Sequence, residues 1–359
     1  MDILLNTLNR IQPLDEPSMQ AARARQDILT KPLGSLGRLE ELSVQVAGVQ
    51  RRGRPNAGRQ TIFVLAGDHG VCAEGVSPYP SEVTAQMVDN FLRGGAGINV
   101  LARHVGARVK VVDLGVAAEL RPHPELLSRK VGWGTANIAL GPAMSREQAV
   151  RAVETGIELV EAEVSRGLDV AGTGEMGIGN TTPSSAIVAA ITGEPVSLVT
   201  GRGAGLDDQQ LRRKIWVIER ALAVNRPDPT DGLDVLAKVG GFEIGGRVGV
   251  ILGAAANRVV VVIDGFVSGA AALIAHLLCP VVRDYMVAAH LSVEIGHQAV
   301  MRRLGLVPLL DLNMRLGEGT GAALGMSLVE AAVKSLNEMA TFAEAGVSEA
   351  REIEPQGAS

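Results

Sequence analysis

The feature that most constrains the fold is a repeated alternation between short, mainly apolar runs and longer stretches of helical periodicity. Each short run is followed by a glycine or an acid, as is typical of strands buried on both faces of a parallel sheet. These runs are 61–66, 109–114, 168–171, 196–200 and 259–263, and two further candidates are 285–289 and 307–312. We therefore predict a strand or buried core segment at each.

Between these runs, apolar residues recur at the spacing of an amphipathic helix. The stretches are 82–105, 145–166, 183–192, 207–224, 268–278 and 292–304. Strands that alternate with helices predict βαβ units. The expected fold class is therefore α/β, with a doubly wound, mostly parallel sheet.

Both ends of the chain have helical patterns instead. Residues 2–52 contain a break at 30–37, and residues 319–345 form a long helical stretch, after which the chain is expected to fray. We predict a large α/β catalytic domain over 61–315 and a small helical domain made from 1–60 with 316–359.

Composition narrows the classes of partner. With 43 glycines and only 3% aromatic residues, the chain favours close backbone approach to a small polar ligand over aromatic stacking. A net charge of −5, with no basic run longer than 212–214, argues against nucleic acid. We expect no export signal and no membrane span. The two cysteines, Cys72 and Cys279, lie far apart outside any metal-binding spacing, which favours reduced thiols in the cytoplasm.

Polar and glycine-rich segments follow the predicted strands. In open parallel sheets, ligands bind beyond the carboxyl ends of the strands, where loops lead into helix N-termini. The segments are 67–70, 172–182, 201–205, Asp264-Gly265, His290 and 315–321. From them we take as candidate substrate-binding residues Gly177, Gly179, Asn180, Arg202, Gly203, Asp264, His290, Arg315 and Leu316.

The second segment contains GxGxxG at Gly172, Gly174 and Gly177, which alone would suggest a dinucleotide fold. Against that interpretation, Glu175 would place a carboxylate beside a diphosphate. In addition, the Thr182-Pro183 pair predicts a helix that starts with Thr182 as N-cap. A loop that cradles a single phosphate, or a plain tight turn, fits these glycines better.

Two other kinds of site are not signalled. The sequence has neither GxxxxGK[ST] nor HExxH, so triphosphate and zincin chemistry are not indicated. Asp68-His69 could hold a metal, but without further ligands a hydrogen-bonded structural role is favoured. We predict no metal and no cofactor.

Four segments in the same order resemble the nicotinate-nucleotide–dimethylbenzimidazole phosphoribosyltransferase family. The likeness extends from about Pro32 to Val347, and 201–207 and Lys214 add to it. The segments are 31–40 (KPLGSLGRLE), 66–71 (AGDHGV), 174–182 (GEMGIGNTT) and 315–319 (RLGEG).

The resemblance implies a homodimer, a Rossmann-like large domain and a small helical domain from both chain ends. It also implies transfer of ribose 5-phosphate from β-nicotinate mononucleotide to 5,6-dimethylbenzimidazole. The products are nicotinate and α-ribazole 5′-phosphate, in synthesis of the lower ligand of cobalamin.

By position, Glu318 matches the family's general base, and Glu175 matches a second carboxylate near the ribose. Gly177, Asn180 and Lys214 match phosphate and ribose contacts, while Pro80, Gln86 and Met87 match the base pocket. Ser81 departs from the longer polar residue expected after Pro80, which leaves the preferred base open.

The chemistry needs few groups. The pyridinium leaves as a neutral ring, so neither a general acid nor a metal is required, and one carboxylate must accept the proton of the attacking azole. Two simpler interpretations are that Glu318 caps the final helix and that Lys214 is a solvated helix residue. Two other functions stay open: an NAD-dependent oxidoreductase, and a non-catalytic nucleotide-binding protein.

Overall fold

The computed structural model describes residues 2–348, which pack as two compact units. The larger unit holds the chain up to Pro13 and Ala57–Ser327, and the smaller unit holds Leu14–Asn56 and the chain from Leu328. These bounds differ from the predicted division at both ends. Helix α1 (Asp2–Arg10) belongs with the larger unit because it packs on the helices that cover the sheet.

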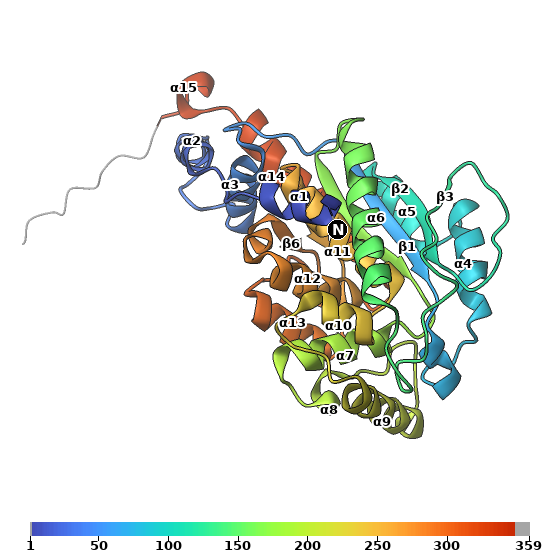
Figure 1. The fold of residues 1–359 in the computed structure, drawn as a ribbon. Coiled ribbons are helices and arrows are strands. Elements are labelled where there is room, and N and C mark those ends of the chain that lie inside the picture. The colour runs from blue at the N-terminus through green and yellow to red at the C-terminus, as the bar shows by residue number, and fades with distance from the viewer. Residues whose placement is uncertain (1, 349–359) are drawn as a thin grey trace, which may run out of the picture. The chain divides into compact units, whose positions relative to one another are not determined.

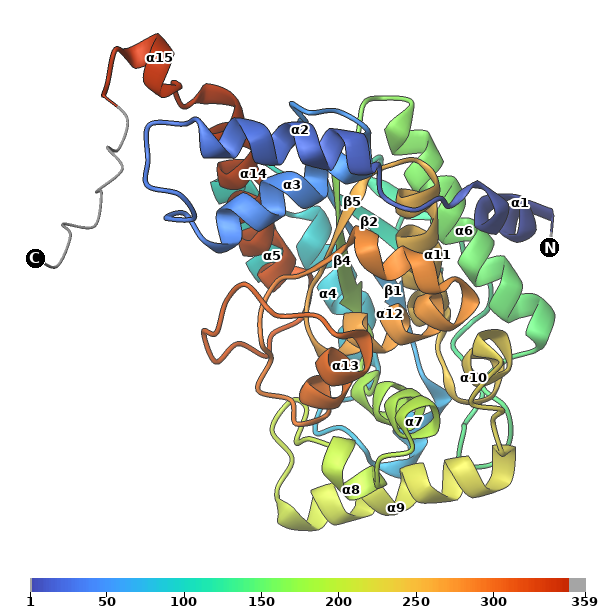
Figure 2. The ribbon, with the colours of Figure 1, turned by 90° about the vertical axis from the view of Figure 1, so that its left-hand side faces the viewer.

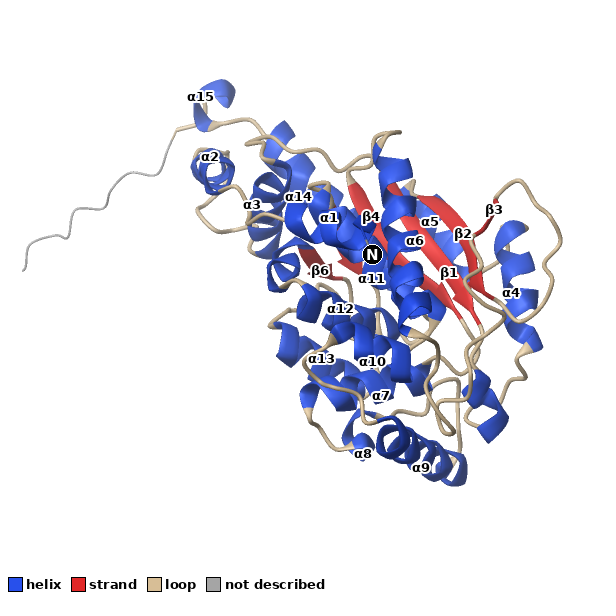
Figure 3. Cartoon of the chain, in the orientation of Figure 1, coloured by secondary structure: helices blue, strands red, loops and turns tan. Residues whose placement is uncertain are grey.

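A six-stranded, all-parallel sheet forms the centre of the larger unit, in the order β3-β2-β1-β4-β5-β6 (Figure 3). The α/β fold class is confirmed. The strand order reverses between β1 and β4, and ligands of doubly wound folds bind beyond the carboxyl ends at such a point. The strands are β1 (Gln60–Gly67), β2 (Arg108–Gly115), β3 (Leu126–Ser128), β4 (Val170–Met176), β5 (Val260–Ile263) and β6 (Met286–Ala288).

Helices cover both faces of this sheet. Figures 1 and 2 show α6 and α11 on one side and α4 and α5 on the other. Besides α1, the helices of the larger unit are α4 (Glu82–Leu92), α5 (Gly97–Val105), α6 (Arg146–Val164), α7 (Thr181–Thr192), α8 (Val196–Val199), α9 (Asp208–Asn225), α10 (Gly232–Val239), α11 (Phe242–Ala256), α12 (Phe266–Leu278), α13 (Gly296–Leu304) and the first part of α14 (Thr320–Glu338). Short 3₁₀ helices lie at η1 (Gly70–Glu74) and η2 (Pro280–Tyr285).

Glycines let α6 and α11 pack at very short range. A Cβ atom on Gly156 would lie 1.9 Å from the Gly246 carbonyl oxygen, and one on Gly249 would lie 1.9 Å from that of Val153. Because no side chain fits there, alanine at either position would force the two helices apart.

Two predicted strands are wrong. Within the run 196–200, Val196–Val199 form the short helix α8, which follows Pro195 and leaves Leu198 exposed, so this run is not buried on both faces. Residues 307–312 form no strand. They make one isolated bridge, Leu310 to His290, just beyond β6, and the Leu309 amide donates to the Ala288 carbonyl of β6. Pro308 has no amide hydrogen to donate to a ladder.

Some predicted helices have different bounds. The stretch 82–105 divides into α4 and α5 at Gly94, whose φ is +76°. The stretch 319–345 divides into α14 and α15 (Phe342–Ala345). Helix α7 begins at Thr181 with Asn180 as N-cap, so Pro183 is its third residue and the predicted N-cap at Thr182 is wrong.

The smaller unit contains α2 (Glu16–Asp27), α3 (Arg38–Gln50), α15 and the end of α14. Its core is formed by Ala22, Val44, Ala47 and Leu336, with Met19 packed against them. The predicted break at 30–37 is held by Lys31, whose ammonium lies 2.8 Å from a Glu40 carboxylate oxygen. That carboxylate also accepts the Leu36 amide at 3.0 Å.

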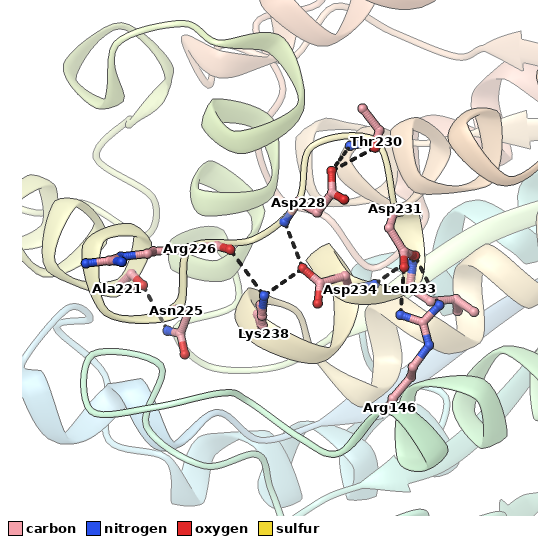
Figure 4. A network of polar contacts seen from close by, with 10 residues as sticks. All are labelled: Arg146, Ala221, Asn225, Arg226, Asp228, Thr230, Asp231, Leu233, Asp234 and Lys238. Carbon is pink, nitrogen blue, oxygen red and sulfur yellow. Dashed lines mark hydrogen bonds and ion pairs between the residues drawn. The ribbon is translucent and has the colours of Figure 1, made fainter.

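A polar network fixes the turn between α9 and α10 in the larger unit (Figure 4). Asp231 caps α10 by accepting from two amides and pairs with the Arg146 guanidinium at 2.8 Å. Asp234 accepts the Asp228 amide at 2.7 Å and pairs with Lys238 at 2.9 Å. Since every acid in this exposed network has a partner, its role is structural.

Within residues 2–348, no helix is long and apolar enough to cross a membrane. Cys72 and Cys279 form no disulfide.

Candidate active site

A cavity of about 420 Å³ opens beyond the carboxyl ends of the strands in the larger unit. Its size suits a small-molecule ligand. The cavity is lined by residues 76–79, 83 and 87 after β1, 175–181 at β4, 203–204 and 214, 264–268 after β5, 290, 292 and 294 after β6, and 315–318 before α14.

Most of the predicted site residues lie together here. Those that line the cavity are Met87, Glu175, Gly177, Gly179, Asn180, Gly203, Lys214, Asp264, His290, Arg315, Leu316 and Glu318. Three others do not line it. Pro80 and Gln86 are exposed, and the Arg202 guanidinium is engaged with the Leu206 carbonyl and the Asp208 carboxylate.

Glu318 projects from an unusual backbone turn. Gly317, Glu318 and Gly319 have φ angles of +82°, +63° and +96°. A glutamate in this left-handed region costs of order 1 kcal/mol, and such strain clusters at functional sites. A Glu318 carboxylate oxygen accepts the Ile98 amide at the start of α5 at 2.9 Å. Glu318 therefore binds the first turn of α5, and its carboxylate is not a cap for α14.

Burial sets the proton affinity of this carboxyl. Glu318 is 6% exposed. Burial raises the Glu318 pKa. Hydrogen bonds from the backbone amides of Ile98 and Gly97 oppose this effect, because they stabilise the charged carboxylate. A carboxylate with a raised pKa is a better proton acceptor than a free glutamate.

Glu175 lies near the end of β4, beside the Glu318 turn. One oxygen accepts from the Asn180 amide group, and the other accepts the Glu318 backbone N–H at 3.4 Å. Burial raises the Glu175 pKa, while the positive charge of Arg247 acts to lower that pKa. Both carboxylates line the same cavity, and the Glu175 carboxylate accepts a hydrogen bond from the backbone of Glu318.

Asp264, directly after β5, is the residue that caps α14. Its oxygens accept the Ala322 amide at 3.0 Å and the Gly319 amide at 3.3 Å. Burial raises the Asp264 pKa to about 7. His290 lies beside it, with Nε2 3.9 Å from Asp264 Oδ1. Through the Gly319 amide, Asp264 thereby fixes the residue that directly follows Glu318.

The loop 177–181 and Lys214 form a second end of the cavity. Lys214 is 1% exposed, so it is not a solvated helix residue, and its ammonium donates to the Thr181 hydroxyl at 2.7 Å. Burial lowers the Lys214 pKa to about 8, and the charge of Glu294 acts to raise the pKa. A buried cation beside the N-terminus of a helix is an arrangement that can bind an anion.

The GxGxxG glycines do not form a dinucleotide loop. Gly172 and Gly174 lie inside β4, and a Cβ atom on Gly174 would be 2.5 Å from the Glu318 carbonyl oxygen. A dinucleotide fingerprint places its glycines in the turn between strand and helix. Here Gly174 instead allows the Glu318 turn to pack on the strand, and Gly172 allows α14 to do so through Met326 and Ala322.

Asp68 and His69 have separate partners. Asp68 accepts the Ala117 amide at 2.7 Å, and His69 Nε2 lies 3.1 Å from Glu243 Oε1. Among residues 2–348, no three His, Cys, Asp or Glu side chains are grouped as a metal-ligand set. The structural role predicted for these two residues fits their contacts.

The predicted site residues did not include several polar residues that line the cavity, namely Ser77, Thr181, Ser268, Ser292 and Glu294. Ser292 and Glu294 were assigned to a helix beginning at 292, whereas α13 begins only at Gly296. Their position directly after a predicted strand was the available signal, because strand ends are where ligands bind.

Comparison with known proteins identifies close relatives. A phosphoribosyltransferase family model matches residues 11–347. A nicotinate-nucleotide–dimethylbenzimidazole phosphoribosyltransferase from Roseiflexus sp. (strain RS-1) is 67% identical over 97% of this chain and 99% of the relative. One of the same name from Geobacter metallireducens is 58% identical over 98% of this chain and 100% of the relative. The crystal structure of CobT from Thermus thermophilus superposes with a TM-score of 0.90 at 49% identity, covering 93% of this chain and 100% of that chain.

Proposed function

Because this chain belongs to the nicotinate-nucleotide–dimethylbenzimidazole phosphoribosyltransferase family, we propose that its cavity carries out that transfer with Glu318 as the base. The enzyme is a pentosyltransferase that moves ribose 5-phosphate from β-nicotinate mononucleotide to 5,6-dimethylbenzimidazole. It yields nicotinate and α-ribazole 5′-phosphate for the lower ligand of cobalamin. The observation that most directly supports Glu318 as the base is that its backbone is strained and its buried carboxylate lies at the cavity wall.

The reaction requires the protein to accept one proton. A bond forms between the azole nitrogen and the anomeric carbon as the bond to the pyridinium nitrogen breaks, and the electron pair neutralises the departing ring. The second azole nitrogen then loses its proton to Glu318. Attack on the face opposite the leaving group inverts the sugar from β to α.

We assign Glu175 to the ribose. A carboxylate near the anomeric carbon stabilises the positive charge that develops as the pyridinium leaves. Asn180 and the Glu318 amide fix its orientation, and Arg247 favours its ionised form. A positioned base supplies about 10²- to 10⁴-fold, so alignment and charge stabilisation must supply the rest.

One part of the cavity wall is apolar and suits the acceptor base. Val76, Tyr79, Val83, Met87 and Leu316 line the cavity together with Glu318. A planar benzimidazole can pack on such side chains while its N–H meets the carboxylate. Pro80 and Gln86, which do not line the cavity, stay predictions.

One assay tests the function. Purified protein is mixed with nicotinate mononucleotide and dimethylbenzimidazole, and free nicotinate and the ribazole product are quantified, with controls that omit each substrate. A non-catalytic nucleotide-binding protein would bind the mononucleotide without releasing nicotinate. An oxidoreductase would instead reduce added NAD in the presence of an oxidisable substrate, which changes the absorbance of the nicotinamide.

We place the phosphate of the donor at the loop 177–181 with Lys214. Lys214→Met is expected to weaken nicotinate mononucleotide binding by about 1 to 3 kcal/mol, because a charge-assisted bond to phosphate is lost. Isothermal titration calorimetry measures this, with the exposed Lys334→Met as a control. Wild-type affinity in Lys214→Met would remove Lys214 from the phosphate site.

Turnover is expected to need no divalent ion, because the pyridinium is already a good leaving group. Exhaustive chelation should leave the initial rate unchanged. If activity disappears with chelator and returns with one particular metal, Asp68 and His69 must be reconsidered as ligands.

We also propose that the enzyme works as a homodimer in the cytoplasm, without a nucleic-acid partner. The family resemblance supports the dimer, the two unpaired thiols suit a reducing compartment, and the net charge of −5 disfavours nucleic acid.

A further inference from the structure

The turn Ser292-Val293-Glu294, between β6 and α13, forms part of the cavity wall at the Lys214 end. Ser292 and Glu294 are both buried and both line the cavity. The Glu294 carboxylate packs on Gly201, where a Cβ atom would lie 2.1 Å from Glu294 Oε2, and its charge acts on Lys214. The Glu294 amide donates to the Ser292 hydroxyl oxygen at 3.3 Å.

One buried histidine ties both ends of this turn. His297, in the first turn of α13, is 1% exposed. Its Nδ1 accepts the Ser292 amide at 2.9 Å, and its own backbone N–H donates to the Glu294 carbonyl at 2.9 Å. The reaction outlined above makes no use of this side chain.

The protonation state of His297 suits an acceptor. A ring nitrogen that accepts a hydrogen bond cannot carry a proton, so the proton of the neutral ring is assigned to Nε2. Burial, and next the charge of His290, lower the His297 pKa to about 3, which keeps the ring neutral at working pH. Within residues 2–348, Nε2 has no hydrogen-bond partner. The contact from Nδ1 to Ser292 is therefore the ring's one polar bond in this part of the chain.

We propose that His297 is a positioning residue that, by accepting the Ser292 amide, sets the turn so that the Ser292 hydroxyl meets the phosphate of the donor nucleotide. This inference rests on the proposed function. Because the Ser292 amide already donates to His297, the Ser292 hydroxyl is the remaining donor of that residue for a phosphate oxygen. The same setting keeps the Glu294 carboxylate against Gly201. A displaced turn would bring that negative charge toward the phosphate.

The test compares a donor that has the phosphate with one that lacks it. His297→Phe keeps a ring of similar size but removes the acceptor, whereas His297→Asn can place an amide oxygen near the Nδ1 position. His276→Phe is the matched control, because His276 lies in the last turn of α12, roughly 15 Å along that helix from cavity-lining Phe266. For each variant, kcat and KM are measured with nicotinate mononucleotide and with nicotinate riboside, together with the melting temperature.

We expect His297→Phe to raise KM for the mononucleotide by about 10- to 100-fold with little change in kcat, while kcat/KM for the riboside stays near wild type. His297→Asn should recover most of the loss, and His276→Phe should leave the ratio between donors unchanged. Equal losses with both donors, or an unchanged ratio in His297→Phe, would overturn the proposal.

A further variant covers the case in which His297→Phe does not fold. Ser292→Ala keeps the backbone amide and removes only the hydroxyl, so it should show the same loss confined to the mononucleotide. Wild-type KM in Ser292→Ala would also overturn the proposal. If wild-type protein releases no nicotinate from either donor, the proposed function fails, whereas an active wild type with an unmoved donor ratio contradicts only the role of His297.

Discussion

Replacing Glu318 by glutamine is expected to lower base transfer by about two to four orders of magnitude while the protein still folds and binds nicotinate mononucleotide. Glutamine keeps an oxygen that can accept the Ile98 amide, so the contact that now holds Glu318 at the start of α5 survives. It cannot accept the azole proton. The change therefore separates the structural use of this side chain from its chemical use.

The pH profile gives an independent measure of the same carboxyl. Because burial raises the Glu318 pKa above its ordinary value of 4.5, the wild-type rate should fall as pH drops through that raised value and the carboxylate becomes protonated. The glutamine variant should lose this acidic limb. Retention of the limb in Glu318→Gln would assign it to another group, of which Glu175 and Asp264 are the nearest candidates by burial and raised pKa.

Two further variants control the experiment. Glu154→Gln changes another buried glutamate that accepts a backbone amide, that of Leu4, on a helix that does not line the cavity. It should transfer at the wild-type rate. Glu175→Gln on the same preparation shows whether the second carboxylate can replace the first. Transfer at the wild-type rate by Glu318→Gln would refute its role as base, and failure to fold would favour a purely structural role.

Local patterns predicted most of the sheet because its strands are short and apolar. Runs at 61–66, 109–114, 259–263 and 285–289 match β1, β2, β5 and β6, whereas the run at 168–171 covers only the start of β4, which continues to Met176. The pattern failed at α11, in which every residue through Ala255 is buried, because a helix that is buried on all sides has no exposed polar face to give a 3.6-residue period. It also failed at 196–200, where an apolar run ends in a helical turn.

The cavity was predictable to the extent that strand ends define it. Glu175, Asp264 and His290 follow or end strands, so the rule for parallel sheets brings them together. Segment 315–321 was placed at the ligand-binding edge because it follows a predicted strand at 307–312, which is not a strand, so the family resemblance was the sounder indication of Glu318. Ser292 and Glu294 were not predicted as site residues because helix boundaries are poorly defined by sequence. The helix was expected to begin at 292, whereas α13 begins at Gly296.

Gly317→Ala is expected to lower kcat/KM by about 100-fold or more although residue 317 has no side chain to contribute to the chemistry. Its φ of +82° makes alanine unfavourable by roughly 1 to 2 kcal/mol. In addition, the new Cβ would lie 2.2 Å from Glu175 Oε1, which forces Glu175 or the Glu318 turn to move. A shift of about 1 Å in such a group can cost about 10²-fold in rate.

The contribution of strain can be separated from that of displacement. Gly193, with a φ of +73°, has no neighbouring atom within 4 Å of an added Cβ, so Gly193→Ala carries the strain without the clash. It should lower the melting temperature and leave kcat/KM unchanged. Glu175→Asp shortens the opposing side chain, so in the double variant with Gly317→Ala the loss of stability should be smaller than the sum of the two single losses. Additive losses, or wild-type activity in Gly317→Ala, would show that the close approach of Gly317 to Glu175 does not position the two carboxylates.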